Sequence, residues 1–327
     1  MSTKKQKIIV IVGQTATGKS DLGVRLARKF NGEIISADSR QVYKGLNIGT
    51  GKITKREMRG VPHHLLDVAS PRRVYTAAEY KRDAEQAIQH IVQKGKIPII
   101  VGGTGFYIDT LLGDITLSNV PPDKKLRARL EKKTTDILLN QLERLDPVRA
   151  QNIDVKNRRR IIRAIEIAKT QTSAGKNYSE YSDHYDVLKI GIKTDDAILK
   201  KNIKKRLLTG LRQGMIAEAK KLHEHGLSWK RMEELGLEYR YLSRYLHGKI
   251  DKPPHLSQYC ASRAPTKSEL YRERCGGKQE MIEQLNTAIW QYARRQKTWF
   301  RRDKKIHWIK PREYKKAEKK LQKFLGK

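Results

Sequence analysis

Residues Ile8–Ser20 decide the fold, and they read IIVIVGQTATGKS. Their first part, Ile8–Val12, is a continuous β-branched run, which is typical of a strand buried on both faces of a parallel sheet. Their second part, Gly13–Ser20, matches the P-loop pattern G-x-x-x-x-G-K-[ST], and a helical pattern follows directly. Since the loop lies between a buried strand and a helix, we interpret it as a phosphate-binding P-loop rather than as a tight turn without a ligand.

The P-loop predicts where a diphosphate or a nucleotide binds. Its glycines allow backbone N–H groups to converge on phosphate oxygens, and the following helix N-terminus adds positive potential. Lys19 would neutralise phosphate charge, and the Ser20 hydroxyl would ligate Mg2+, the cofactor that we expect. Kinases, ATPases and diphosphate-releasing transferases all use such loops, so the loop alone does not choose between them. The predicted binding residues are Gly13, Gln14, Thr15, Ala16, Thr17, Gly18, Lys19 and Ser20.

The alternation of strand and helix continues after the P-loop. Glu33–Ser36 and Ile97–Val101 read as further strands, and Ala77–Val92 reads as a helix between them. Such alternation predicts an α/β fold, namely a P-loop NTPase-like parallel sheet flanked by helices. We assign residues 1–120 to the first part of this core.

Four further segments differ in composition. Residues 121–184 lack strand patterns and space their apolar residues as helices do, which predicts a small all-helical insertion. Residues 185–252 open with a strand pattern at Tyr185–Ile192 and are predicted to return to the core. Paired prolines and paired glycines favour a loop or insertion at residues 253–280. Residues 281–327 are predicted to form a basic C-terminal helical region.

The charge of the chain indicates a polyanionic partner. The 327 residues include 70 Lys and Arg against 35 Asp and Glu, a formal net charge of +35. A field of this sign and strength attracts nucleic acid. The excess is steepest in residues 285–327, with 15 Lys or Arg, 3 Asp or Glu, and interleaved aromatic residues. A solvated lysine-rich surface is the alternative interpretation of this segment.

Cysteine usage and apolar runs bear on where the protein works. Cys260 and Cys275 have neither the spacing of a zinc site nor the dense even count of a secreted disulfide scaffold. The first apolar run, Ile8–Val12, is too short for a signal peptide or a membrane span. We therefore expect a cytoplasmic protein with no membrane partner.

An acidic residue follows the second predicted strand. Asp38 stands at the carboxyl end of that strand, where open α/β sheets place their active sites. Its carboxylate is a candidate Mg2+ ligand, helix N-cap or general base, and the spacing leaves these roles open. The third predicted strand runs into Gly102–Gly105 with no acidic residue at its end, which weakens the interpretation as an NTPase.

Several segments, in this order along the chain, make it resemble the bacterial-type tRNA dimethylallyltransferases, also called isopentenyl-tRNA transferases or IPP transferases. They are Gly13–Ser20, Ser36–Tyr43, Ile48–Thr50, Val61–Leu65, Gly102–Gly105, Arg160–Glu166 and Tyr292–Arg301. Three features depart from the family pattern: a shorter helical insertion, a longer segment at residues 253–280, and a varied Arg295–Lys297. None of these departures lies in the P-loop.

The resemblance implies an enzyme that transfers a dimethylallyl group from dimethylallyl diphosphate to tRNA. The acceptor would be the exocyclic amine of the adenosine immediately 3′ of the anticodon, position 37, in tRNAs that read codons starting with U. The P-loop would then hold the diphosphate of the prenyl donor rather than ATP. The implied partners are the anticodon stem-loop of tRNA and dimethylallyl diphosphate, and we expect a monomer.

The resemblance also implies roles for particular residues. Asp38 would take the proton from the adenine amine, and the implied catalytic residues are Asp38, Lys19, Arg206 and Thr17. The implied tRNA contacts are Asp38, Ser39, Arg40, Gln41, Thr104, Arg127, Arg159, Arg160, Ile161, Ile162, Arg163, Tyr239 and Arg240. For the arginines at 159–163, the alternative is a salt bridge between helices.

An amphipathic pattern near the C-terminus predicts a basic helix. Apolar residues from Met281 to Trp299 share one helical face, and basic residues lie largely around the other sides. We expect Arg294 and Arg295 on this helix to contact tRNA.

Two other classes of protein would also combine a P-loop with a basic surface. One is a kinase of nucleotides or small metabolites, and the other is an ATP-dependent RNA-binding protein without transfer chemistry. Both predict hydrolysis of ATP or GTP, or phosphoryl transfer from them, whereas a prenyltransferase predicts neither.

Overall fold

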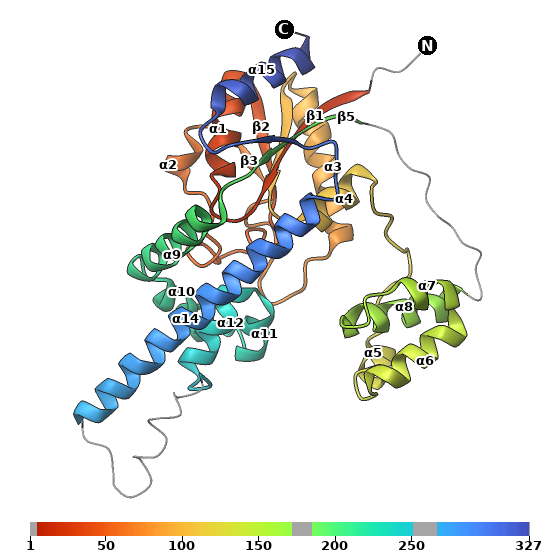
Figure 1. The fold of residues 1–327 in the computed structure, drawn as a ribbon, viewed down its shortest axis with the longest axis vertical. Helices are drawn as coiled ribbons and strands as arrows, with labels where there is room; N and C mark the ends of the chain where they lie inside the picture. Colours follow the sequence, from red (N-terminus) through yellow and green to blue (C-terminus); the bar gives the residue numbers. More distant parts are fainter. Residues whose placement is uncertain (1–4, 172–184, 251–266, 327) are drawn as a thin grey trace, which may run out of the picture. The chain divides into compact units, whose positions relative to one another are not determined.

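A six-stranded parallel sheet lies at the centre of the larger of two compact units in the computed structural model, which describes residues 5–171, 185–250 and 267–326. The strand order is β3-β2-β4-β1-β5-β6, and all neighbouring pairs are parallel (Figure 1). The predicted α/β fold is confirmed. The strands are β1 (Gln6–Gly13), β2 (Gly32–Ala37), β3 (His63–His64), β4 (Ile97–Gly102), β5 (Tyr185–Ile192) and β6 (His307–Ile309).

β1 supplies side chains to hydrophobic cores on both faces of the sheet. Ile8, Val10 and Val12 belong to one core, and Ile9 and Ile11 belong to the other. Each of the five is at most 1% exposed. Because successive side chains of a strand point to opposite faces, an unbroken β-branched run is what a strand covered on both faces requires.

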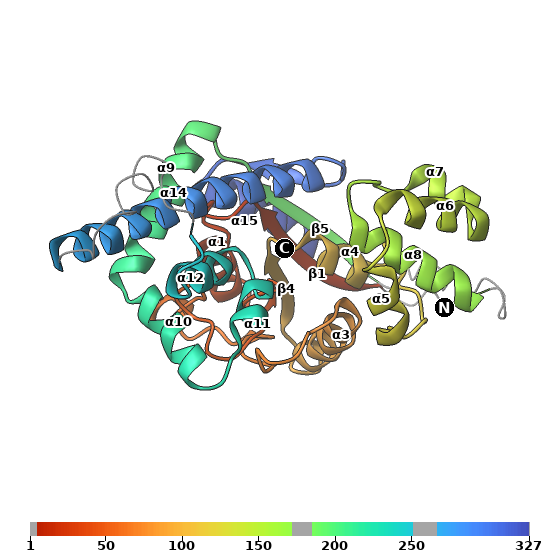
Figure 2. The ribbon, with the colours of Figure 1, turned by 90° about the horizontal axis from the view of Figure 1, so that it is seen from below.

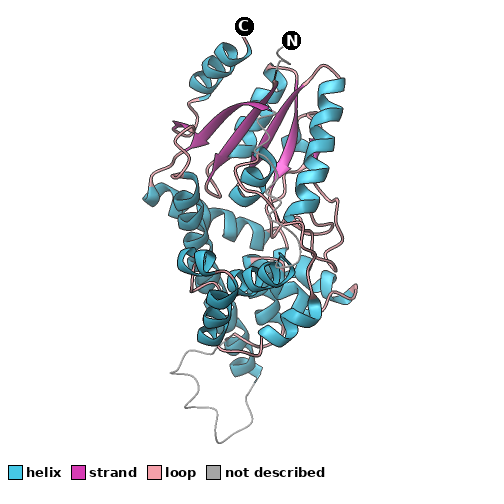
Figure 3. Cartoon of the chain, turned by 90° about the vertical axis from the view of Figure 1, so that its right-hand side faces the viewer, coloured by secondary structure: helices cyan, strands magenta, loops and turns pink. Residues whose placement is uncertain are grey.

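Helices cover both faces of the sheet (Figure 3). The core around Ile9 includes residues of α1 (Lys19–Lys29) and α15 (Tyr314–Leu325). The core around Ile8 includes residues of α3 (Ala77–Gln93), α4 (Gly105–Leu112), α9 (Asp196–Arg212), α10 (Met215–Glu224), α11 (Trp229–Glu234), α12 (Leu237–Leu246) and α14 (Lys267–Phe300). α14 packs against α9 and α12 (Figure 2). A further short helix is α2 (Lys55–Met58), and none of the described helices is both long and apolar enough to span a membrane.

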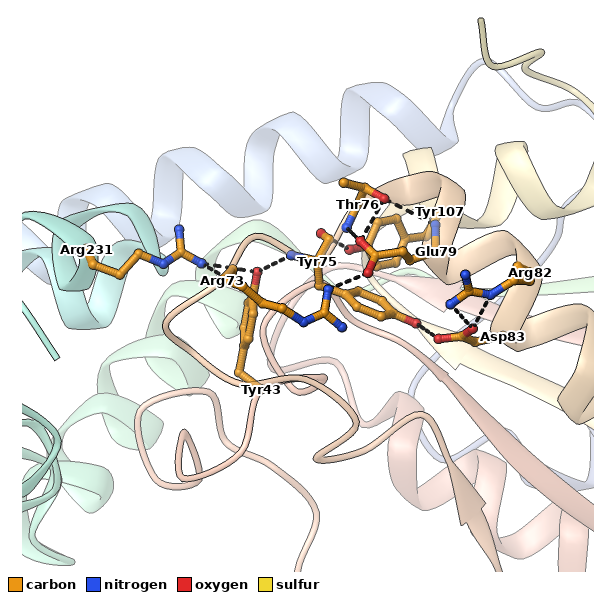
Figure 4. A network of polar contacts seen from close by, with 9 residues as sticks. All are labelled: Tyr43, Arg73, Tyr75, Thr76, Glu79, Arg82, Asp83, Tyr107 and Arg231. Carbon is orange, nitrogen blue, oxygen red and sulfur yellow. Dashed lines mark hydrogen bonds and ion pairs between the residues drawn. The ribbon is translucent and has the colours of Figure 1, made fainter. Parts of the chain in front are cut away.

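A polar network connects the segment before α3 to α11 (Figure 4). The Tyr43 hydroxyl accepts hydrogen bonds from the N–H of Tyr75 at 3.0 Å and from Arg231 at 3.5 Å. The Tyr75 hydroxyl in turn donates to Asp83 in α3 at 2.7 Å. Tyr43 comes shortly after Asp38 in the sequence, so the network holds the chain where it leaves the end of β2.

Gly113–Tyr181 forms the second compact unit. Its described helices are α5 (Lys124–Leu130), α6 (Thr135–Leu145), α7 (Pro147–Asn152) and α8 (Arg158–Gln171). Their buried side chains form a small core of their own, made of Leu126, Leu130, Leu138, Leu142, Ile161, Ile162, Ala164 and Ile165. The predicted helical insertion at residues 121–184 overlaps this unit, and residues 172–184 lie outside the described ones.

A loop or insertion was predicted at residues 253–280, and the loop alternative is wrong for residues 267–280. Residues 251–266 lie outside the described part of the chain, but α14 begins at Lys267 and continues through the paired glycines. Each glycine costs about 1 kcal/mol in a helix relative to alanine. The Glu, Arg, Leu and Lys residues around Gly276 and Gly277 are strong helix formers, which offsets that cost.

Candidate active site

The P-loop is shaped by its glycines and by hydrogen bonds to one carbonyl. Gly18 precedes α1 with a φ of 89°, in the left-handed region that glycine adopts without strain. A Cβ at Gly13 would lie 2.9 Å from a carbonyl oxygen of β5, so β1 must end in glycine. The Gln14 carbonyl accepts hydrogen bonds from the Thr17 hydroxyl at 2.8 Å and the Lys19 ammonium at 2.5 Å. Thr17, only 5% exposed, therefore supports the loop from within.

Two cations approach the P-loop from different elements. Arg206 of α9 donates to the Thr15 hydroxyl at 3.1 Å and to the Thr50 carbonyl at 2.8 Å. Burial, and secondly the charge of Arg206, lower the pKa of Lys19 to about 7, while the charge of Asp38 opposes this shift. An anion between the two cations would stabilise both charges, which is the electrostatic property that a diphosphate site needs.

A carboxylate of α10 organises the loop that contacts Arg206. Glu218 accepts hydrogen bonds from three successive backbone N–H groups and, at 2.6 Å, from the hydroxyl of Tyr239. The three N–H groups are those of Asn47, Ile48 and Gly49, at 3.0, 2.8 and 3.0 Å. The next residue, Thr50, is the one whose carbonyl binds Arg206, so Glu218 positions this arginine through the loop.

Asp38 lies at the end of β2 and begins a turn. Its Oδ1 accepts hydrogen bonds from the N–H groups of Arg40 at 2.9 Å and Gln41 at 3.4 Å. The N–H of the intervening Ser39 donates to the hydroxyl of Thr104 at 3.0 Å. No helix begins at this turn, so the helix N-cap interpretation of Asp38 is wrong. Its backbone partners orient the carboxylate instead.

α14 connects the P-loop to the loop after β4. The Gln296 side chain accepts a hydrogen bond from the N–H of Thr15 at 2.8 Å and donates to the carbonyl of Gly103 at 2.9 Å. Gln14 donates to the carbonyl of Ala293 at 3.0 Å. A Cβ at Gly103 would lie 2.3 Å from the Gln296 amide nitrogen, so this approach requires glycine. Sequence reasoning did not identify Gln296 as a residue of the site.

Two cavities meet at the P-loop. The first has a volume of about 620 Å3, with one wall from Thr15–Asp21 and an apolar wall that includes Ile48, Ile203, Leu207 and Met215. The second, of about 320 Å3, is lined by polar and basic residues that include Asp38, Arg40, Gln41, Tyr292, Arg295 and Gln296. The residues that line both are Thr15, Lys19, Ser20, Gly51, Arg206, Glu238 and Ile289. The structure thus brings Asp38, Lys19 and Arg206 together.

Most residues of the larger unit that were expected to contact tRNA border the second cavity. Those in its walls are Asp38, Ser39, Arg40, Gln41, Arg240 and Arg295. Arg294 is exposed on α14. Thr104 does not line this cavity, and its hydroxyl accepts a hydrogen bond from the N–H of Ser39. Tyr239 is also absent from the walls; it is 1% exposed and its hydroxyl donates to Glu218. The structure therefore contradicts a tRNA contact through the Tyr239 side chain.

In the helical unit, Arg127 and Arg163 both bind Glu166. Arg127 donates to the two carboxylate oxygens at 2.9 and 2.7 Å, and Arg163 donates to one of them and to the Val120 carbonyl. Glu166 is 1% exposed. Burial raises its pKa, but the hydrogen bonds from Arg127 and Arg163 and from a backbone N–H outweigh burial and leave the pKa lowered. These two arginines therefore stabilise the unit, Arg127 by an ion pair between α5 and α8 and Arg163 by an ion pair within α8. The salt-bridge alternative for residues 159–163 expected a bridge between helices, whereas Arg163 pairs within its own helix.

The other expected tRNA contacts of this segment differ in burial. Ile161 and Ile162 are 0% and 3% exposed in the core of the unit, which contradicts a tRNA contact through their side chains. Arg159 and Arg160 are exposed and line a cavity of about 620 Å3 together with Arg149. They stay candidates for phosphate contacts.

Comparison with known proteins relates the chain to one family. Residues 41–303 match the family model described as IPP transferase. The tRNA dimethylallyltransferase 2 of Shewanella sediminis (strain HAW-EB3) is 40% identical over 313 residues, with 94% of each chain covered. That of Treponema denticola is 39% identical over 312 residues, 93% of this chain and 96% of the relative.

Solved structures agree in fold. The tRNA isopentenylpyrophosphate transferase of Bacillus halodurans has a TM-score of 0.66 and 31% identity, with 98% of this chain and 96% of that chain covered. A eukaryotic dimethylallyltransferase described as acting on tRNA has a TM-score of 0.74 and 25% identity, with 97% and 78% covered. The family model spans most of the chain, and the relatives match it almost end to end. This chain therefore belongs to the IPP transferase family.

Proposed function

We propose that this chain is a tRNA dimethylallyltransferase, which transfers a dimethylallyl group from dimethylallyl diphosphate to an exocyclic adenine amine of tRNA. The observation that carries this proposal is the pair of cavities that share the P-loop residues Lys19 and Ser20. One cavity offers cations for a departing diphosphate, and the other holds the carboxylate of Asp38. Relatives that carry this enzyme name match nearly the whole chain.

On the donor side, the diphosphate would bind between Lys19, Arg206 and the backbone N–H groups of the P-loop. The apolar wall of the first cavity would accommodate the prenyl group. As the carbon–oxygen bond breaks, negative charge grows on the bridging oxygen, and preorganised cations stabilise it. Lys19 and Arg206 are held in place by the Gln14 and Thr50 carbonyls, so they need no rearrangement.

The donor set around the P-loop fits a magnesium ion that binds with the diphosphate. Ser20 lines both cavities, and its hydroxyl would supply one hard oxygen ligand. Nowhere in the described residues do three His, Cys, Asp or Glu side chains gather into a metal site. Diphosphate oxygens and water would therefore supply the other ligands, and the bound ion would neutralise charge on the leaving group.

On the acceptor side, Asp38 would act as the general base. The amine nitrogen forms a bond to the allylic carbon, the bond from that carbon to the bridging oxygen breaks, and the proton passes from nitrogen to Asp38. The two backbone N–H groups on Oδ1 hold this carboxylate at the edge of the second cavity. Of the roles that the sequence left open, we favour this one over metal ligation, because Asp38 lies in the cavity that the adenine would enter.

The second cavity would admit an adenine only after that base has left its stack in the anticodon loop. We propose position 37 of tRNAs that read codons starting with U as the target, which rests on the family resemblance alone. Arg40, Arg240 and Arg295 in the cavity walls are suited to hold the flanking phosphates or to stack on unpaired bases. We also propose that the chain acts as a monomer in the cytoplasm.

Two incubations with different labelled donors distinguish this function from that of a kinase or an ATPase. The protein would be incubated with unmodified tRNA, Mg2+ and either labelled dimethylallyl diphosphate or labelled ATP. The proposed function predicts prenyl label in tRNA and no transfer or release of the ATP phosphate. Phosphate release or transfer without prenyl label in tRNA would contradict it.

A further inference from the structure

Glu238, in the first turn of α12, occupies the wall that the two cavities share. Within the described residues, it is the one acidic side chain that lines both of them. The carbon that is transferred must lie at this junction, because the leaving diphosphate is on one side and the acceptor amine on the other. A carboxylate at this place is unexpected beside an apolar prenyl group unless it has a polar or charged partner during the reaction.

The carboxyl of Glu238 also differs from the other acidic groups around the cavities. Asp21 accepts a hydrogen bond from the Tyr314 hydroxyl, and Glu57 caps α2 through Thr54. In the described part of the chain, the Glu238 carboxyl has no hydrogen bond or ion pair with another residue. Burial is the largest cause and leaves the pKa of Glu238 raised; the charge of Asp38 acts in the same sense, while its own N–H and the charges of Arg206 and Arg40 oppose the shift. Glu238 is thus a half-buried acid with room for a positive partner in the substrates.

We propose that Glu238 is a second catalytic carboxylate, which stabilises the positive charge that develops on the transferred carbon and the attacking amine. The inference rests on the proposed function. As the carbon–oxygen bond weakens, its electron pair moves to the diphosphate and the allylic carbon becomes electron-poor; bond formation then makes the amine nitrogen positive. Asp38 removes the proton, and Glu238 exchanges none. In its ionised form, the carboxyl beside these atoms stabilises the transition state more than the ground state, in which the allylic carbon and the amine carry no charge.

The same charge has the opposite effect on the bound donor. Before the reaction, Glu238 faces a diphosphate that is already negative, close to Arg206, and like charges repel. Removal of the charge should therefore improve or leave unchanged the binding of the donor while it slows the chemical step. A residue that only supports the fold would instead weaken binding and turnover together.

The test is prenyl transfer by Glu238→Gln, which keeps the size of the side chain and removes its charge. Steady-state kinetics give kcat and KM, and a single turnover gives the rate of the chemical step. We expect kcat to fall about 10²-fold, in the range for a single electrostatic group in an active site. The KM for dimethylallyl diphosphate should be equal or lower, and tRNA affinity should be retained. Glu238→Asp, which restores the charge one methylene away, should recover part of the rate.

Glu224→Gln is the matched control, since Glu224 is exposed on α10 and lines neither cavity. Its kcat should stay within about twofold, as expected for a surface substitution away from the reacting atoms. An unchanged kcat in Glu238→Gln would overturn the proposal, and so would a fall in kcat with a raised KM that Glu238→Asp does not recover. If the unaltered chain transfers no prenyl group at all, the proposed function itself fails, which the wild-type arm shows separately.

Discussion

Single residues of the site depend on backbone groups of other segments. The Asp38 carboxylate is oriented by two N–H groups of its own turn, while Lys19 and Arg206 are held by carbonyls of the P-loop and of the loop before Gly51. A Cβ at Gly51 would lie 2.1 Å from the Arg206 guanidinium. Side chains held in this way are oriented before substrate binds, which is what transfer chemistry requires of them.

The role of Asp38 gives the sharpest prediction at this scale. Asp38→Ala should lower single-turnover prenyl transfer about 10²–10⁴-fold, as expected for the loss of a general base. Affinity for tRNA, measured by filter binding, should change by a small factor. Asp38→Asn is the matched variant, because its amide oxygen can still accept the two backbone hydrogen bonds but cannot take a proton. Wild-type turnover in either variant would remove Asp38 from the mechanism.

Among the elements, the loop between β2 and α2 depends on α10. Glu218→Gln keeps the shape of the side chain but replaces a charged acceptor of four hydrogen bonds by a neutral amide. Loosening this loop displaces the Thr50 carbonyl from Arg206. We expect the KM for dimethylallyl diphosphate to rise about tenfold, the equivalent of about 1.4 kcal/mol. Steady-state kinetics with varied donor and saturating tRNA measure this.

Glu224→Gln on the same helix is the control for the Glu218 prediction. Glu224 is exposed and forms an ion pair with Lys220, four residues earlier on α10. This variant should keep the wild-type KM. Equal donor KM values for Glu218→Gln and the wild type would show that the loop does not need this carboxylate.

The helical unit depends on the ion pairs of Glu166 with Arg127 and Arg163. Because the pKa of Glu166 is lowered, its charge stabilises the folded unit above the ordinary pKa, and this stabilisation is lost as pH falls through the lowered value. Glu166→Gln should destabilise the unit by about 2 kcal/mol, as for a lost charged hydrogen bond. Hydrogen exchange of α5 and α8 amides measures this.

Glu143→Gln provides the comparison for Glu166, because Glu143 is exposed on α6 of the same unit. In the Glu143→Gln variant, the amides of α5 and α8 should exchange at wild-type rates. Protection in Glu166→Gln that equals the wild type at neutral pH would mean that the buried ion pairs contribute nothing to stability.

For the whole molecule, the excess of positive charge is the dominant property. Arg294, Arg295 and Arg301 are exposed on α14 or directly after it, and Arg295 lines the second cavity. Replacing the three by Gln should weaken tRNA binding and flatten its dependence on salt. Each lost phosphate contact should reduce the slope of log affinity against log salt by about 0.7–0.9.

Three lysines on α15 provide the control that separates the effect of α14 from that of net charge. Lys315, Lys316 and Lys319 are exposed on α15, and their replacement by Gln removes the same charge. The slope should change less in this variant than in the α14 variant. An α14 variant with the wild-type slope would show that the helix is structural and that tRNA docks elsewhere.

Much of the fold could be predicted because its determinants are local in sequence. The β-branched run of β1, the P-loop and the strand Tyr185–Ile192 all appear in the structure as predicted. The site was predicted only in part, because Glu218 and Gln296 act through partners far along the chain and Glu238 is recognised only by its place between the two cavities. Glu218, for example, lies 170 residues from its partner Ile48. Tyr239 and Ile161 were assigned as tRNA contacts although their side chains are buried, because the resemblance identifies segments and does not show which side chains are buried.

Nucleoside analysis of tRNA shows whether the protein prenylates adenosine. Unmodified tRNA would be incubated with the protein, Mg2+ and dimethylallyl diphosphate in the presence of excess ATP, then digested and examined by mass spectrometry. The account predicts one adenosine, next to the anticodon, that carries a dimethylallyl group on its exocyclic amine, and release of an equal amount of diphosphate. Unmodified adenosine in this tRNA, with ATP consumed instead, would contradict it.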